Sequence, residues 1–141
     1  MMFESKPCII PLPKILDSRG NLSFLESEGH IPFKINRVHW IYDVPGGEMR
    51  GNLAYKTTQE FIIAMSGSFD VFIDDGVNQY NFNLNRSYFG VYIPQGCWRR
   101  IDNFSTNSVA LIAASTKYNP TDAIRDYPTF LNYIAHASKN R

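Results

Sequence analysis

Apolar and β-branched residues come in short runs that Gly, Pro, Asn and Asp interrupt, and within most runs they alternate with polar residues. Asp75 and Gly76 form a hairpin signal between two runs, because Asp-Gly readily takes the positive φ angles of tight turns; Gly67 marks a second turn. Many short strands at this spacing predict an all-β antiparallel sandwich or barrel. The segments that read as strands are 22–27, 30–35, 37–44, 60–75, 79–84, 88–94 and 108–115.

Helical character is confined to the tail, residues 121–141, where Pro128 predicts a division into one short turn and one short helix. The pattern shows no repeats and no low-complexity tracts. A length of 141 residues therefore fits a single domain over residues 1–141.

Composition then narrows the classes of function. Hydrophobic residues make up 44% of the chain and charged residues only 19%, which is typical of a packed globular protein. The net charge is only +1, whereas proteins that bind nucleic acids usually carry a strong excess of positive charge. No apolar run reaches the length of a secretory signal or a membrane span. We therefore expect no nucleic-acid partner, no membrane partner and a cytoplasmic location.

One segment resembles the first of the two cupin motifs. Gly47, Glu60 and Gly67 occupy frame positions of that motif, whereas Leu53 and Tyr55 stand where it has two histidines. The spacing is intact although the imidazoles are replaced.

A later segment resembles the second cupin motif in the same way. Pro94, Gly96 and Asn103 occupy frame positions, and Arg99 stands where the third histidine is expected. A cupin metal centre uses three imidazoles and one carboxylate, and of these only Glu60 is present. We therefore expect no metal at these positions and no cofactor.

Nearly the whole chain is similar to the WxcM-like cupins of sugar-nucleotide metabolism, which include thymidine-diphosphate-4-keto-6-deoxyglucose 3,4-ketoisomerases. The resemblance implies a cupin (RmlC-like) β-barrel or jelly roll with a short C-terminal helix. It also implies a small-molecule nucleotide sugar as ligand, and a homodimer in which an N-terminal strand from residues 8–16 crosses to the partner. The matching segments are 17–22, 31–33, 37–38, 50–56, 90–92, 98–104 and 124–127.

The chemistry of that family passes through an enediol, because a ketone moves between C4 and C3 of a hexose, and it needs groups that take up and deliver protons. Leu53 cannot transfer a proton, whereas Tyr55 can. Residues two apart on a strand share a face, so Leu53 and Tyr55 should both point inward if the family's histidines do.

The strand that begins at Arg37 offers a second proton-transfer group. Alternation places Arg37, His39 and Ile41 on one face, and in the ketoisomerases the position of His39 is often tyrosine. We identify Tyr55 and His39, assisted by Glu60, as candidate catalytic groups. The alternative is that His39 is an ordinary half-buried strand residue and Tyr55 only fills the space of a lost imidazole.

Cationic and aromatic residues around the two motifs are typical of a phosphate-bearing, stacking ligand. Arg19 lies in a separate loop segment, and its alternative is a salt bridge to Asp17. The candidate substrate-binding residues are Arg50, Arg99, Arg19, Lys56, Tyr92 and Trp98.

Two functions follow. The first is an isomerase of a nucleotide-linked 4-keto-6-deoxyhexose that uses Tyr55 and His39. The second is a catalytically inactive binding or assembly protein that kept the pocket frame after losing the histidines.

Overall fold

Antiparallel strands dominate the structure, a computed structural model that describes residues 6–139. The strands are β1 (Cys8–Pro11), β2 (Lys14–Ile15), β3 (Leu22–Ser23), β4 (Arg37–Ile41), β5 (Arg50–Tyr55), β6 (Glu60–Ser66), β7 (Phe69–Asp74), β8 (Gln79–Leu84), β9 (Phe89–Ile93), β10 (Trp98–Asp102), β11 (Val109–Ala114) and β12 (Ala123–Ile124). A 3-10 turn, η1 (Pro120–Asp122), and one helix, α1 (Tyr127–Lys139), complete the chain.

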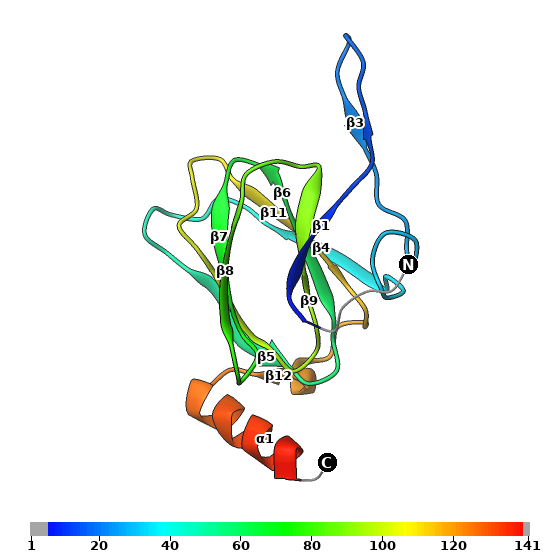
Figure 1. Ribbon diagram of the computed structural model, residues 1–141. Coiled ribbons are helices and arrows are strands. Elements are labelled where there is room, and N and C mark those ends of the chain that lie inside the picture. The colour runs from blue at the N-terminus through cyan, green and yellow to red at the C-terminus, as the bar shows by residue number, and fades with distance from the viewer. Residues whose placement is uncertain (1–5, 140–141) are drawn as a thin grey trace.

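Two sheets of five strands face each other and form the walls of a barrel (Figure 1). The first sheet has the order β1-β9-β6-β11-β4, the second has the order β12-β5-β10-β7-β8, and β2 pairs with β3 in a separate hairpin. Neighbouring strands are antiparallel throughout. This arrangement confirms the predicted all-β jelly roll with a short C-terminal helix.

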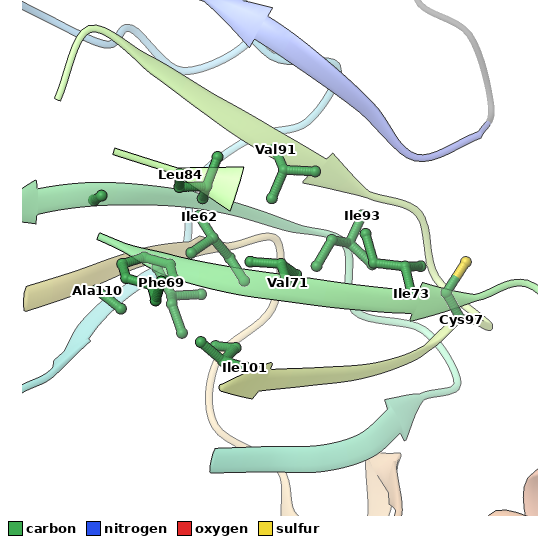
Figure 2. Close-up of a cluster of buried hydrophobic side chains, with 12 residues drawn as sticks. Ile62, Phe69, Val71, Ile73, Leu84, Val91, Ile93, Cys97, Ile101 and Ala110 are labelled. Carbon is green, nitrogen blue, oxygen red and sulfur yellow. The ribbon is translucent and has the colours of Figure 1, made fainter. Parts of the chain in front are cut away.

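The interior is filled by aliphatic side chains at alternate positions of both sheets, as the two-residue period of a strand requires. Ile62 and Val91 from the first sheet meet Val71 and Ile101 from the second, and all four are inaccessible to solvent (Figure 2). Toward one end of the barrel the same inward positions carry polar side chains, and there the candidate site lies.

Residues 30–35, which the pattern predicts as a strand, form bends and a loop. Ile31 and Phe33 are nevertheless buried, because the loop packs them on the outer face of the first sheet beside Ile63. Pro32 between them lacks the N–H that a strand ladder needs. Alternate burial here marks a covering loop, and the strand prediction for this segment was wrong.

The hairpin of β2 and β3 extends away from the barrel as an arm, residues 14–23 (Figure 1). Its apolar side chains are open to solvent, with Ile15 52%, Leu16 72% and Leu22 55% exposed. Of the predicted strand 22–27, only Leu22–Ser23 pairs in the arm. β1, by contrast, pairs with β9 of its own chain.

Helix α1 lies against the outer face of the second sheet (Figure 1). Pro128 occupies its first turn, where the missing N–H costs no helical hydrogen bond. The predicted short turn and short helix are both present, but β12 separates them and Pro128 lies within the helix instead of dividing the two. Phe130 is fully buried and packs on Trp98.

Candidate functional site

Five side chains with polar ends converge between the two sheets and form a polar cluster. They come from β4, β5, β6 and β10, at inward positions that continue the aliphatic rows of the core. The polar cluster consists of Arg37, His39, Tyr55, Glu60 and Arg99.

Arg99 and Glu60 form a buried ion pair across the barrel. Arg99 Nε donates to Glu60 Oε1 and Arg99 Nη2 donates to Glu60 Oε2, each at 2.8 Å. The exposed fractions are only 3% for Arg99 and 1% for Glu60. Burial lowers the pKa of Arg99, but the charge of Glu60 and its hydrogen bonds raise that pKa more, so the guanidinium stays charged. Both carboxylate oxygens of Glu60 are therefore already engaged.

Gly51 makes room for this pair. Its carbonyl oxygen accepts a hydrogen bond from Arg99 Nη1 at 3.1 Å, and a Cβ atom at this position would overlap the Arg99 guanidinium. The residue has φ +70°, and the pairing of β5 with β10 shifts register here, which is the mark of a β-bulge. Gly51 thus serves the packing of Arg99.

His39 lies in the centre of β4, half-buried, with Arg37 beside it on the same face. Desolvation by burial lowers the pKa of His39; the carboxylate of Glu60 opposes that shift, and the guanidinium groups of Arg37 and Arg99 add to it. The imidazole is therefore neutral near pH 7. Its Nδ1 atom is buried and has no hydrogen-bond partner among residues 6–139.

Tyr55 and Arg37 bring the two sheets together at the polar cluster. The centre of the Tyr55 ring lies 5.9 Å from Arg37 Cζ and 5.7 Å from Arg99 Cζ, within range of cation–π attraction. The centre of the Tyr118 ring lies 5.8 Å from Arg37 Cζ.

Arg37 and Tyr118 were not among the sequence candidates. For Arg37 the signal was present, because it lies two residues from His39 on the same strand face. Tyr118 had no such signal, because it follows β11 in an irregular segment whose path only the fold determines.

A buried network holds the turn between β5 and β6 in place. Asp122 accepts hydrogen bonds from the Thr57 backbone and hydroxyl and from the Thr58 hydroxyl, at 2.6–3.0 Å. This turn connects Tyr55 to Glu60, so the network fixes the spacing of two members of the polar cluster.

The remaining cationic candidates lie outside the polar cluster. Arg50 is exposed at the opposite end of β5 from Tyr55, where it lines a cavity of about 410 Å³ together with Trp40 and Glu48. Lys56 is exposed directly after Tyr55. Arg19 is at the tip of the arm and pairs with Asp17, its Nη2 atom 2.8 Å from the carboxylate, which was the alternative interpretation.

Tyr92 and Trp98 are both buried and point away from the barrel interior. The Tyr92 hydroxyl donates to Gln59 Oε1 at 2.6 Å on the outer side of the first sheet, and burial raises the pKa of Tyr92 to about 12. Trp98 packs under α1. Strand alternation accounts for both placements, since their neighbours Val91 and Arg99 face inward.

Within residues 6–139, no three His, Cys, Asp or Glu side chains are grouped so that they could hold a metal ion. Glu60 is the single carboxylate at the cupin ligand positions, and Arg99 engages both of its oxygens. The residues present therefore do not fit a cupin metal centre. No helix in the described part of the chain is long and apolar enough to span a membrane.

Comparison with known proteins gives a consistent result. The family model for FdtA, WxcM-like, C-terminal, matches residues 5–135. The TDP-4-oxo-6-deoxy-alpha-D-glucose-3,4-oxoisomerase of Aneurinibacillus thermoaerophilus is 38% identical over 127 residues, which cover 90% of this chain and 91% of that protein.

Solved structures agree with this match. A 3,4-ketoisomerase from Helicobacter canadensis superposes with a TM-score of 0.89 at 36% identity, covering 94% of this chain and 99% of the other. The RmlC epimerase of Mycobacterium tuberculosis shares the fold at 18% identity, with a TM-score of 0.73 over 93% of this chain and 75% of that one.

Proposed function

Because this chain belongs to the WxcM-like, C-terminal (FdtA) family, we propose that it is a 3,4-ketoisomerase of a nucleotide-linked 4-keto-6-deoxyhexose. The relatives at this level of identity carry that activity in their names. The TDP-sugar that the Aneurinibacillus protein is named for is the first substrate to test.

The observation that carries the proposal is the state of His39. Proton abstraction next to a ketone needs a base that is unprotonated near neutral pH and free of a competing hydrogen bond. His39 meets both conditions, because its pKa is lowered and its Nδ1 atom has no partner among the described residues. Tyr55, whose ring lies near the guanidinium groups of Arg37 and Arg99, supplies a hydroxyl on the facing sheet.

The reaction then balances without an oxidant or a metal. His39 removes the proton from C3, which leaves an enediolate with its negative charge on O4. Tyr55 exchanges protons with the two oxygens, so that O4 becomes protonated and O3 gives up its proton. A proton returned to C4 completes the 3-keto product, and the enzyme regains its starting protonation. Glu60 acts indirectly, since it holds Arg99 beside the Tyr55 ring.

For phosphate, the exposed cations Lys56 and Arg50 are the candidates within one chain. Arg19 on the arm can serve only a site that the arm reaches, which supports a contribution to a neighbouring subunit. Arg99 is a weaker candidate, because Glu60 holds its Nε and Nη2 atoms and the Gly51 carbonyl accepts a hydrogen bond from Nη1.

A homodimer is part of this proposal. The arm exposes Ile15, Leu16 and Leu22, an apolar surface that a second copy would cover. The sequence predicted exchange of a strand from residues 8–16, but β1 pairs with β9 of its own chain, so we propose the arm as the element that contacts the partner. We expect Leu16→Asp with Leu22→Asp to give a monomer in sedimentation velocity. Val77→Asp, a change at a still more exposed apolar residue in the β7–β8 turn, should leave a dimer. A wild-type monomer at all concentrations would refute the dimer.

One observation favours the second candidate, a binding protein without activity. Leu53 offers no proton-transfer group, and Glu60 is engaged by Arg99, so catalysis depends on His39 and Tyr55 alone.

The two candidates separate in one experiment. The protein is incubated with TDP-4-keto-6-deoxyglucose in deuterated water and followed by proton NMR, with thermal stabilisation by TDP recorded in parallel. An isomerase incorporates deuterium and forms the 3-keto sugar, and Tyr55→Phe should slow this roughly 10²-fold or more. Stabilisation by TDP without any incorporation would establish the binding protein.

A further inference from the structure

We propose that Arg37 is the oxyanion-binding residue of the polar cluster and that it holds two neighbouring ligand oxygens through Nε and Nη2. The chemical class is an oxyanion with two oxygens in reach of one guanidinium edge. In the proposed reaction this is either the enediolate of the sugar or a phosphate of the nucleotide, so the identity of the anion rests on the proposed function.

One edge of the Arg37 guanidinium has no hydrogen-bond partner in the described chain. Arg37 Nε and Nη2 are both buried from solvent, and neither has a hydrogen-bond partner among residues 6–139. A desolvated guanidinium without a hydrogen-bonded partner is costly, and proteins retain one where an anionic ligand completes it. His39 Nδ1, on the same strand face, is unpartnered too.

Arg99, in the same barrel, shows what such a guanidinium edge binds. Arg99 uses its Nε and Nη2 atoms to hold both oxygens of one carboxylate, at 2.8 Å each. Arg37 presents the same edge, with the same two nitrogens, and no protein carboxylate meets it among the described residues. A guanidinium edge of this kind matches two coplanar oxygens.

The charges of the polar cluster do not balance. Among the charged side chains that act on His39 there are two cations, Arg37 and Arg99, and one anion, Glu60. Glu60 does not meet the Nε and Nη2 atoms of Arg37, because both of its oxygens bind Arg99. The two residues lie on strands that β11 separates. With His39 neutral, the polar cluster carries one uncompensated positive charge.

Arg37 is also oriented by aromatic rings. Its Cζ atom lies 5.9 Å from the centre of the Tyr55 ring and 5.8 Å from that of the Tyr118 ring, within range of cation–π attraction. His39, the proposed base, is two residues away on the same face. An oxyanion formed when His39 takes a proton would therefore arise next to a cation that is already oriented.

The test compares Arg37→Gln with a matched control, Arg100→Gln. Arg100 is also half-buried and lies over an aromatic ring, that of Phe72, but it points outward and is paired with Asp102. Two quantities are measured for each variant and for wild type: the Kd for TDP by calorimetry, and the rate of C3 deuterium incorporation with TDP-4-keto-6-deoxyglucose. Melting curves check that both variants fold.

If Arg37 binds the enediolate, Arg37→Gln lowers the incorporation rate roughly 10²–10³-fold and leaves the TDP Kd within about twofold. If it binds phosphate, the TDP Kd rises tenfold or more. Arg100→Gln should change neither quantity.

Wild-type values for both quantities in a folded Arg37→Gln variant would overturn the proposal. A wild-type protein that never incorporates deuterium, while its TDP affinity falls in Arg37→Gln, would refute the isomerase and keep the Arg37 site. The failure of one inference is thus distinguishable from the failure of the other.

Discussion

Two arginines face the interior of this barrel, and their surroundings differ in almost every respect. Arg99 is fully buried, donates from Nε and Nη2 to Glu60, and donates from Nη1 to the carbonyl of Gly51. Arg37 is half-buried, lies within cation–π range of two tyrosine rings, and has the same two nitrogens without a partner in the described chain.

The difference separates a structural ion pair from a site that accepts a ligand. A buried pair in which both carboxylate oxygens and all three guanidinium nitrogens are hydrogen-bonded keeps its geometry and has little left for a substrate. A positioned cation without a counter-charge can stabilise negative charge on a bound ligand, because no protein carboxylate already neutralises it. Glu60 and Arg99 bind each other here, and the proposed chemistry lies with Arg37, His39 and Tyr55.

The largest expected effect comes from breaking the structural pair. Arg99→Met leaves Glu60 as an unpaired buried charge, and we expect the free energy of unfolding to fall by about 3–5 kcal/mol in urea titrations. The double variant Arg99→Met with Glu60→Met should recover most of that loss, because no buried charge remains.

Arg37→Met is the matched comparison. It removes a cation that no protein group neutralises, so we expect the free energy of unfolding to change by no more than about 1 kcal/mol. Equal losses for Arg99→Met and Arg37→Met would remove the distinction between the two arginines.

A smaller effect is expected where the backbone makes room for Arg99. Gly51→Ala introduces a Cβ atom that overlaps the guanidinium and adds strain at φ +70°, so we expect a loss of about 1–3 kcal/mol in the free energy of unfolding. Gly46→Ala is the control, since its Cβ would meet no atom within 4 Å. Equal stabilities for the two variants would mean that Gly51 is not required by the pair.

The smallest expected effect is the pH dependence of the free energy of unfolding that His39 contributes. The folded pKa of His39 lies below its ordinary value of 6.5, so the unfolded chain binds the proton more readily than the folded chain. His39 therefore stabilises the fold fully above about pH 6.5, and this contribution is lost as the pH falls toward the folded pKa. Unfolding free energies measured from about pH 5 to about pH 7.5 should rise less steeply in His39→Gln than in wild type. Parallel profiles would contradict a lowered pKa.

Much of the fold was predictable from the sequence, because apolar alternation and turn residues act locally. The turns at Gly67 and Gly76 have positive φ angles, as Gly at those positions suggested, and the inward face of β4 is the predicted one. The prediction failed at β5 and β10, which were absent from the strands read by alternation. Their inward positions carry Tyr55 and Arg99, so the polar site itself disrupts the pattern that identifies strands.

The site was only partly predictable. Motif spacing pointed to Tyr55 and Glu60, and strand alternation together with the family resemblance pointed to His39; the structure places all three in the polar cluster. The sequence could not show that Arg99 would bind Glu60 or that Arg37 would lack a partner, since both depend on side-chain contacts between sheets. Tyr92 and Trp98 drew attention as aromatic residues, but their strand phase directs them outward.

The most direct test of this account is the rate of C3 deuterium incorporation into TDP-4-keto-6-deoxyglucose as a function of pH, for wild type and His39→Gln. We predict incorporation by the wild type, with an acid limb below the ordinary histidine pKa of 6.5, and a rate lower by roughly 10²–10⁴-fold in the folded variant. Equal rates and equal pH profiles in the two proteins would contradict the assignment of His39 as the base.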